Sequence, residues 1–480
     1  MIPERLRWLV EPGSPPYQLG ELFEKAGYRL YLVGGSVRDA FLGRPDEDLD
    51  FATDAPPDEI ERIVRGWAEG VHTVGKAFGT IAARKAGRLY EITTFRREIY
   101  RDDSRKPVVT FSKRIEDDLA RRDFTVNAVA LRLPQIEVVD PYGGLADLAA
   151  GVLRTPIDPH ESFSDDPLRM LRLFRFQATL GFRPDVEAVE AVKEMAGRLQ
   201  IVSAERIRDE FSKLIVAEEV TAPLWGLVRT GLADQFIPEL PALEMEQDPI
   251  HHHKDVLAHT IAVTAKTSPG NLRLRLAALL HDIGKPATRE IGPDGVSFHH
   301  HEVVGARMAR DRLRALRYPK SLVEEVSRLV FLHLRPHTLK MGWTDSAVRR
   351  YVRDAGDLLD DLNELVRCDV TTRNPKRAAA IQRRIDELER RIAELREKEE
   401  LARMRPPIDG NQVMAYLGIR PGPMVGEIMD VLLEKRIEEG PYSEREAYET
   451  VRRWALERGL NDPGPPPPDA GDQPVTRDLG

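Results

Sequence analysis

The chain has 480 residues, of which 41% are hydrophobic and 31% charged, and its net charge is −8 at pH 7. This length predicts roughly two to four domains, and the composition is that of a soluble globular protein. No apolar run reaches membrane-spanning length, and the N-terminal MIPERLRWLVEPGSPP lacks the apolar core of a signal peptide, so we exclude both features.

Cysteine content and net charge indicate the cellular compartment and the kind of partner. One cysteine, Cys368, cannot form an intrachain disulfide, which predicts a reducing, cytoplasmic location. The negative net charge argues weakly against a nucleic-acid partner, because such proteins are often basic. Arginine-dense segments such as RMLRLFRFQ and RLRALRYPK indicate that individual faces are nevertheless basic.

Residues 30–133 combine short β patterns with helical ones. We expect strands in YLVGG, DLDFAT, TIAARKA, LYEITTF and AVALRL, and helices in SVRDAFLG and PDEIERIVRGW. These patterns predict an α/β module.

The rest of the chain is predominantly helical in pattern. Residues 165–219, 256–287 and 303–335 predict helices. Residues 376–403 predict a long charged helix with heptad-like apolar spacing, which is either an antiparallel coiled arm or a solvated connector. The tail 461–480 is rich in Pro, Gly and Asp, which predicts disorder.

The segment LVGGSVRDAFLGRPDEDLDF joins two glycines and an arginine to a pair of acids. Because side chains alternate along a strand, Asp48 and Asp50 point the same way and need a cation between them, and Mg²⁺ commonly bridges carboxylates to phosphates. Gly34 and Gly35 allow backbone N–H groups to approach a triphosphate, and Arg38 lies in the first turn of the following helix. The segment predicts a metal–nucleotide site, and the alternative is a surface turn.

A second glycine-rich segment, GVHTVGKA, nearly fits the phosphate-binding pattern GxxxxGK[ST]. Ala77 stands where the pattern requires a magnesium-binding hydroxyl, and the preceding RGWAEG indicates the end of a helix. We therefore expect a bend before the strand TIAARKA.

The order of motifs resembles a known family. LVGGSVRDAFLG followed by DLDF is similar to the signature of the bacterial class II tRNA nucleotidyltransferase and poly(A) polymerase family, within the polymerase-β-like superfamily. Four later segments resemble its ribose-contacting, hinge, nucleotide-selecting and neck motifs: LARRDFTVNAVAL, DPYGGLADL, FSDDPLRMLRLFRF and SAERIRDEFSKLI. Asp165 departs from the family pattern, which usually has glutamate there.

The resemblance implies an α/β (α+β) polymerase-β-like nucleotidyltransferase head, an all-α neck, an HD domain and a helical tail. The expected domains are an N-terminal extension 1–29, the head 30–150, the helical neck 151–235, the HD metal-binding domain 236–375, a helical arm with a tRNA-contacting segment 376–460, and a disordered tail 461–480.

The chemistry implied for the head is a metal-assisted in-line displacement. Two Mg²⁺ ions would activate a 3′-hydroxyl and stabilise the leaving pyrophosphate, with Asp48 and Asp50 as ligands. Glu91 in LYEITTF is the candidate third acid, and a solvent-facing strand glutamate is an equal alternative.

Asp166 and Arg169 are the expected readers of the nucleotide base. They are three residues apart and would share a helical face. A carboxylate accepts from the exocyclic amine of cytosine or adenine and a guanidinium donates to the adjacent ring nitrogen, whereas guanine and uracil present the reverse pattern. The alternative is an amphipathic helix with exposed ion pairs.

The family resemblance alone implies that three further arginines lie in the nucleotide pocket. These are Arg122, Arg172 and Arg175. Asp123 and Asn127 would contact the sugar or brace the loop, and the sequence leaves both roles open.

Histidines and aspartates recur in AHT, LLHDIGKPAT, FHHHEVVGA, VFLHLRPH and VRCDVT. This order resembles the HD phosphohydrolase superfamily. The resemblance implies one ion held by His259, His281, Asp282 and Asp369, and a second site supplied by His301 and His333. Mn, Ni, Fe, Zn or Mg²⁺ would suit these donors, and the ion would support phosphate-ester hydrolysis unless the unit is only structural.

Together the motifs predict template-independent addition of C and A nucleotides, as CCA or a subset, to tRNA 3′ ends from CTP and ATP. The alternatives are a poly(A) polymerase with the same acids and a metal-dependent phosphohydrolase with a nucleotide-sensing head. Residues 408–440 resemble the family's C-terminal helical segment, whose expected partner is the phosphate backbone of the tRNA body. Both a monomer and a homodimer are compatible with the sequence.

Overall fold

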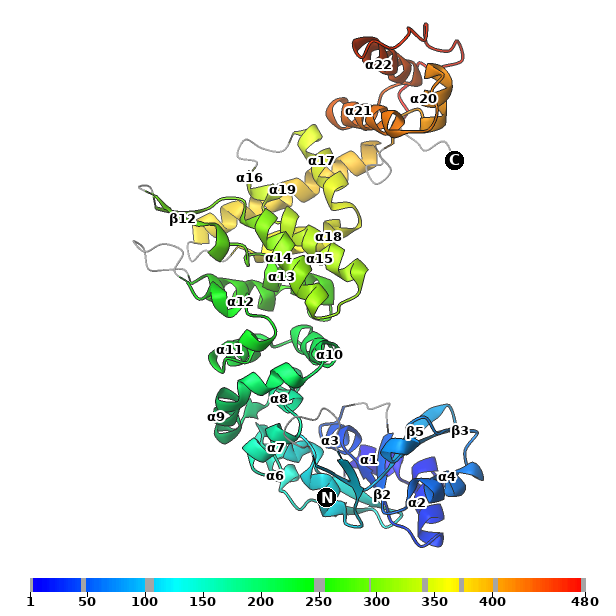
Figure 1. Cartoon of the computed structure of the whole chain (residues 1–480), viewed down its shortest axis with the longest axis vertical. Helices are drawn as coiled ribbons and strands as arrows, with labels where there is room; N and C mark the ends of the chain where they lie inside the picture. The colour runs from blue at the N-terminus through cyan, green and yellow to red at the C-terminus, as the bar shows by residue number, and fades with distance from the viewer. Residues whose placement is uncertain are drawn as a thin grey trace. The chain divides into compact units, whose positions relative to one another are not determined.

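The computed structural model describes residues 3–44, 49–99, 108–245, 255–292, 295–338, 344–370, 375–399 and 405–475. The chain divides into two compact units, one formed by residues 1–244 with 312–318 and the other by residues 245–311 with 319–480 (Figure 1).

The first unit is built on a seven-stranded mixed sheet of order β3-β4-β5-β2-β1-β8-β9. Its strands are β1 (Leu30–Val33), β2 (Leu49–Thr53), β3 (Gly70–His72), β4 (Thr80–Lys85), β5 (Arg88–Thr94), β8 (Ala130–Leu133) and β9 (Glu137–Val139). Only the β2–β5 pair is parallel among the described pairs of this sheet. The five strands predicted from the sequence are confirmed, whereas β3 and β9, with three residues each, are too short to show a pattern.

Six helices accompany this sheet: α1 (Glu4–Leu9), α2 (Pro15–Lys25), α3 (Gly35–Phe41), α4 (Pro57–Arg65), α5 (Ile115–Ala120) and α6 (Gly144–Ala150). The two predicted helices, α3 and α4, are confirmed. Leu6 of α1 and Phe23 of α2 are fully buried in the same core as the strands, so the part expected as an N-terminal extension contributes to the head. A separate hairpin is formed by β6 (Arg96–Ile99) and β7 (Val108–Phe111).

The remainder of the first unit is helical, as the sequence predicts. Its helices are α7 (Pro159–Asp165), α8 (Leu168–Leu180), α9 (Val186–Met195), α10 (Ala204–Ile215) and α11 (Thr221–Arg229), with a short parallel pair β10 (Val152–Leu153) and β11 (Arg183–Pro184). Asp158 caps α7 and Ser203 caps α10, each accepting hydrogen bonds from backbone N–H groups of the first turn.

The second unit is also helical. Its helices are α12 (Val256–Lys266), α13 (Leu272–Leu280), α14 (His301–Ala315, of which residues 301–311 belong to this unit), α15 (Lys320–Leu332), α16 (Arg335–Thr338), α17 (Asp345–Ala355), α18 (Leu359–Cys368), α19 (Pro375–Glu399), α20 (Gly410–Leu417), α21 (Pro423–Glu439) and α22 (Glu444–Glu457). A two-stranded hairpin, β12 (Arg289–Gly292) with β13 (Gly295–Phe298), separates α13 from α14.

The long charged helix α19 packs against other helices of the chain, which contradicts the solvated connector. Its heptad-spaced residues Ile385, Leu388, Ile392 and Leu395 are buried, and the helix packs on α17 and α18. Arg367 of α18 forms ion pairs with Asp386 and Glu389. The apolar stripe is therefore covered within the chain, which the repeat spacing alone does not reveal.

The tail also differs from the expected disorder over its described part, residues 461–475. It has no helix or strand, as its Pro and Gly content predicts, yet Ala470 is 6% exposed within the core around α22. The carboxylate of Asp462 forms an ion pair with Arg452, and Gly471 N–H donates to Glu444. Proline restricts the unfolded chain, so a few contacts suffice to hold an irregular segment.

Within the described residues, no helix is both long enough and apolar enough to span a bilayer.

Candidate functional site

A cleft of about 920 Å³ opens in the first unit. Its volume lies in the range usual for ligand sites. Eight arginines and three aspartates dominate its lining: Gly34, Gly35, Arg38, Asp50, Gly75, Phe78, Thr80, Arg96, Arg121, Arg122, Asp123, Asn127, Asp166, Arg169, Arg172, Arg175, Phe176 and Arg206. The excess of positive charge suits a polyanionic ligand such as a nucleoside triphosphate.

The glycine turn lies at the junction of β1 and α3. Gly34 has φ +77°, and a side chain there would lie 2.9 Å from Arg122 Nη1. Glycine is therefore favoured by the left-handed backbone conformation, and the guanidinium of Arg122 lies directly beside it. Arg38, one turn into α3, donates to Asn127 Oδ1 at 2.7 Å and to both carboxylate oxygens of Asp39. The side chain is thus fixed at the cleft wall.

The acid face is supplied by neighbouring parallel strands. Asp50 of β2 lines the cleft and is exposed between buried Leu49 and Phe51. Glu91 of β5 is its register partner, so both carboxylates lie on the same face of the sheet. Glu91 is not among the cleft-lining residues, and Asp48 lies outside the described residues.

Asp123 is a buried brace of the cleft floor. Its Oδ1 accepts from Phe124 N and Asn127 Nδ2, both at 2.8 Å, and its Oδ2 lies 2.8 Å from Arg172 Nη2. Burial alone would raise the pKa of this carboxyl, but the charge of Arg172 and the Asn127 hydrogen bond outweigh it and lower the pKa. Of the two roles left open by the sequence, these bonds favour bracing.

Asp118 is a site residue that sequence reasoning missed. It is 1% exposed and contacts Arg121 at 3.1 Å and Arg122 at 3.3 Å. Burial opposes its ionised form, yet the two guanidinium groups lower its pKa. Because α5 ends at Ala120, Arg121 and Arg122 lie beyond the helix, and their spacing from Asp118 alone does not predict these contacts.

The expected base-reading pair does not share a helical face. Asp166 follows α7 with extended backbone, φ −140° and ψ 99°, and precedes α8, whereas Arg169 lies in the first turn of α8. The prediction was wrong because Pro167 disfavours helical backbone at the residue before it. Both residues nevertheless line the cleft.

Each member of this pair has other partners in the structure. Asp166 Oδ1 accepts from Leu168 N at 3.1 Å, and Oδ2 lies 2.8 Å from Arg206 Nη2. Arg169 Nη1 donates to the carbonyl and hydroxyl of Ser162 at 3.1 and 3.0 Å, and Nη2 donates to the carbonyl of Arg121. Arg169 therefore ties α7, α8 and the Arg121 turn together.

Arg172 and Arg175 continue the arginine wall along α8. The guanidinium of Arg175 stacks 3.5 Å from the centroid of the Phe176 ring and donates to Glu210 Oε2 at 2.9 Å. Arg38 and Arg172 lie 5.3 and 5.6 Å from the same ring. Phe176 thus serves as a shared platform for three cations.

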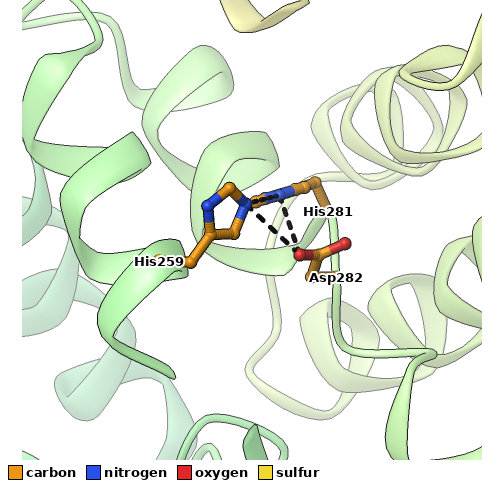
Figure 2. Close-up of side chains that lie close together, drawn as sticks. All are labelled: His259, His281 and Asp282. Carbon is orange, nitrogen blue, oxygen red and sulfur yellow. Dashed lines mark hydrogen bonds and ion pairs between the residues drawn. The ribbon is translucent and has the colours of Figure 1, made fainter. Parts of the chain in front are cut away.

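A second cluster lies in the second unit, where α12, α13 and α18 meet. Figure 2 shows the side chains of His259, His281 and Asp282 close together. His259 Nε2 lies 3.3 Å from His281 Nε2, 3.4 Å from Asp282 Oδ2 and 3.0 Å from Asp369 Oδ1. His281 Nε2 lies 3.2 Å from Asp282 Oδ2 and 3.5 Å from Asp369 Oδ1. Four of the predicted metal ligands therefore converge.

The remaining two predicted ligands approach Asp282 from the other side. His301 Nε2 lies 3.4 Å from Asp282 Oδ1, and these atoms together with His333 fall within 4.8 Å of one another. The Nε2 atoms of His301 and His333 are buried without a hydrogen-bond partner among the described residues. Unpartnered buried nitrogens around a carboxylate are donors that a cation would satisfy.

Backbone carbonyls fix the orientation of three of these rings. Nδ1 of His281, His301 and His333 lies 2.7, 2.9 and 2.6 Å from the carbonyls of Ala278, Phe298 and Val330. A donor hydrogen on each Nδ1 leaves Nε2 as a lone-pair donor toward the cluster centre, as in metal-bound histidines.

The electrostatics of the cluster also favour a cation. Burial alone would lower the pKa of His281, but Asp282 and Asp369 outweigh it and raise the pKa to about 10. Burial and the charge of His281 lower the pKa of His333 to about 3. Lys285 Nζ, which no sequence motif identified, lies 2.7 Å from Asp282 Oδ2. The carboxylates thus attract positive charge that a divalent ion would supply.

Comparisons with known proteins agree that the arginine-lined cleft and the histidine–aspartate cluster belong to different parts of the chain. A family model described as Poly A polymerase head domain matches residues 30–154, one described as Probable RNA and SrmB- binding site of polymerase A matches residues 181–243, and one described as HD domain matches residues 252–391.

Two relatives align along nearly the whole chain. The A-adding tRNA nucleotidyltransferase of Deinococcus radiodurans is 34% identical over 459 residues, covering 93% of this chain and 98% of that protein. The CCA-adding enzyme of a Geobacillus species is 29% identical over 459 residues, covering 94% and 98%.

Solved structures share the fold. The Bacillus stearothermophilus CCA-adding enzyme in complex with CTP has a TM-score of 0.65 and 25% identity, covering 93% of this chain and 99% of that chain. The Thermotoga maritima CCA-adding enzyme complexed with tRNA_CCA has a TM-score of 0.59 and 18% identity, covering 94% and 98%. The polymerase-β-like head, helical neck and HD domain expected from the sequence are thereby confirmed.

Proposed function

Because this chain belongs to the tRNA nucleotidyltransferase family, we propose that it adds C, C and A to tRNA 3′ ends from CTP and ATP. The observation that carries the proposal is the arginine-lined cleft with Asp50 on its acid face. The relatives that align along nearly the whole chain are an A-adding tRNA nucleotidyltransferase and a CCA-adding enzyme, which favours this activity over poly(A) synthesis.

Different residues of the cleft have different roles in the reaction. The guanidinium groups of the arginines bind the triphosphate and the leaving pyrophosphate. Asp118, Asp123 and Glu210 hold these groups in place, so that they are already oriented for the ligand. Asp48 and Asp50, with Glu91 beside Asp50, would hold Mg²⁺. When bound, such ions lower the pKa of the attacking 3′-hydroxyl and neutralise the leaving group.

Nucleotide choice is assigned to Asp166 together with Arg169. In this proposal Asp166 exchanges its ion pair with Arg206 for the exocyclic amine of cytosine or adenine. A carboxylate rejects guanine and uracil, which present an acceptor at the corresponding position. No nucleic-acid template is needed for this discrimination.

Addition of A alone is a second candidate. The relative that is 34% identical over nearly the whole chain is an A-adding tRNA nucleotidyltransferase, whereas the full-length CCA-adding relative quoted above is 29% identical. The two candidates differ in the first nucleotide that the enzyme accepts.

The histidine–aspartate cluster supports a separate phosphohydrolase activity. His259, His281, Asp282 and Asp369 would hold one divalent ion, and His301 and His333 with the second oxygen of Asp282 would hold another. When bound, such an ion acidifies water and polarises a phosphoryl oxygen. Against the opposing effect of burial, the charge of His281, and then that of Lys285 at 2.7 Å, lowers the pKa of the Asp282 carboxyl.

The test uses tRNA transcripts that end at the base before CCA, or in CC, with labelled CTP or ATP and Mg²⁺. The proposal predicts two C residues and one A on the first transcript and one A on the second. Incorporation only on the transcript ending in CC would favour the A-adding candidate. Long A tails on both would instead indicate a poly(A) polymerase.

A further inference from the structure

An exposed aromatic ring lines the arginine cleft. Phe78 is 63% exposed and belongs to the same cleft as Gly34, Asp50 and Arg122. The other aromatic ring of the cleft lining, Phe176, is buried and covered by the guanidinium of Arg175. Within the described lining, Phe78 is therefore the aromatic face that remains open to a ligand.

The loop that carries Phe78 is firmly held. Phe78 ends the short 3₁₀ turn η1 (Lys76–Phe78), between β3 and β4. Lys76 Nζ lies 2.6 Å from both Asp58 and Glu61 of α4. Lys76, the lysine of the near match to a phosphate-binding loop, is paired with these acids and anchors the turn. The predicted bend before β4 is confirmed.

Two further contacts fix the Phe78 side of the turn. Arg96 Nη1 donates to the Phe78 carbonyl at 2.9 Å, and Thr94 N donates to the Gly79 carbonyl at 2.9 Å. Gly79 has φ +87°, and a side chain there would lie 2.9 Å from the ring of Phe111. The exposure of Phe78 therefore reflects an anchored position, since the turn is tied to α4, β5 and β6.

We propose that Phe78 is the stacking platform for the 3′-terminal base of the acceptor RNA, an inference that rests on the proposed function. The acceptor's terminal 3′-hydroxyl has to lie beside the acid face that includes Asp50, and in-line attack requires close alignment. A base stacked on the cleft wall would provide that alignment.

Stacking also fits the changing identity of the acceptor. In stepwise addition the terminal base differs from one step to the next, so hydrogen-bond readout of one base would reject the others. Every base has a π face, and base–aromatic stacking is tolerant of sequence. A bare phenyl ring, with no donor or acceptor of its own, matches this requirement.

The test compares Phe78→Leu and Phe78→Trp in the full chain. Phe78→Leu keeps apolar bulk and removes the ring, so we expect KM for tRNA lacking CCA to rise about tenfold. The KM for CTP and ATP should stay within about twofold of wild type, because nucleotide binding uses the arginine wall. Phe78→Trp should restore the KM for tRNA.

A binding measurement gives a second readout. A tRNA carrying 2-aminopurine as its 3′-terminal base should lose fluorescence on binding to wild type and to Phe78→Trp, and lose clearly less on binding to Phe78→Leu. Val74→Ala is the matched control, since Val74 is 95% exposed in the same loop and does not line the cleft. Its KM for tRNA should equal that of wild type.

The outcomes separate this inference from the proposed function. An unchanged KM for tRNA and unchanged quenching in Phe78→Leu would overturn the role of Phe78 while leaving nucleotide addition intact. A rise in the KM for nucleotides with no change for tRNA would assign the ring to the incoming nucleotide and also overturn the inference. Failure of wild type to extend any tRNA would instead overturn the proposed function.

Discussion

Acids hold the arginines of the cleft in place. Asp118 contacts Arg121 and Arg122, and Asp123 contacts Arg172. A charge that is already oriented costs little reorganisation when a ligand arrives. The sequence identified most of the arginines by motif, but it did not identify Asp118, whose role depends on burial in the folded head.

The acid face supports a first prediction. Asp50→Asn should lower the rate of nucleotide incorporation more than about a hundredfold, because loss of even a supporting partner of a metal ligand costs about ten- to a hundredfold. Glu91→Gln should lower the rate by a smaller factor, about tenfold, as a neighbouring acid of the same face. Steady-state incorporation at saturating Mg²⁺ measures both. A wild-type rate for Glu91→Gln would show that Glu91 does not take part in the reaction and is only a solvent-facing glutamate of the strand.

Base selection supports a second prediction. Asp166→Ala should reduce the preference for CTP over UTP by about ten- to a hundredfold, because a hydrogen bond to a charged group contributes about 1.5–3 kcal/mol. Competition between the two nucleotides on one tRNA measures the ratio. Arg206→Ala is the control, since Arg206 pairs with Asp166 only until the base replaces it. If both variants lost selectivity equally, Asp166 would not be the reader.

At the scale of elements, the local sequence pattern predicted the strands, but it did not predict which strands pair or where helices end. The alternation in DLDFAT and LYEITTF predicted β2 and β5, and the structure adds their parallel register, which pairs Asp50 with Glu91. The spacing of Asp166 and Arg169 suggested one helix, but Pro167 separates them into the end of α7 and the start of α8. Strand pairing and helix ends depend on distant partners, which is why a single sequence cannot specify them.

The hinge segment DPYGGLADL gives a prediction about packing. A side chain at Gly144, the first residue of α6, would lie 2.1 Å from the Thr125 carbonyl. Gly144→Ala should therefore destabilise the protein by about 1–3 kcal/mol or more. Gly66→Ala, where a side chain meets no atom within 4 Å, should change stability by less than about 0.5 kcal/mol. Urea unfolding of both variants tests the contrast, and equal stabilities would contradict it.

The buried brace Asp123 gives a prediction about pH. Its pKa is lowered in the folded state, since burial is outweighed by Arg172 and Asn127. The ionised carboxylate therefore stabilises the fold above its unfolded pKa of about 3.9, and this stabilisation is lost as the pH falls through the lower, folded-state pKa.

Asp123→Asn tests this sign. The variant should be less stable than wild type by about 1.5–3 kcal/mol at pH 7 and should lose part of the wild-type decline below about pH 4. Urea unfolding at pH 7 and between pH 5 and 3 supplies both values. Parallel pH profiles for the two proteins would show that Asp123 does not contribute.

At the scale of the whole molecule, two sites lie in two separately packed units. The cleft belongs to the first unit and the histidine–aspartate cluster to the second. The order of motifs predicted this succession, and the comparisons agree with it. What the sequence did not predict is the covered stripe of α19 and the packed tail, because burial depends on which surfaces meet.

Separate sites imply separable activities. Asp282→Asn should abolish binding of divalent transition metal, measured by metal analysis of the purified protein, and should abolish phosphate release from a phosphate ester. Nucleotide incorporation into tRNA should stay within about twofold of wild type, because Asp282 belongs to the second compact unit and is not among the residues that line the cleft. Loss of both activities together would contradict two independent sites.

The central claim is that the arginine cleft of the first unit extends the 3′ end of tRNA. Sequencing the 3′ ends of a tRNA transcript lacking CCA, after incubation with CTP, ATP and Mg²⁺, tests it most directly. Wild type should produce ends completed by CCA, and Asp50→Asn should leave the transcript unextended at matched time. Equal extension by both proteins would contradict the assignment of the reaction to this cleft.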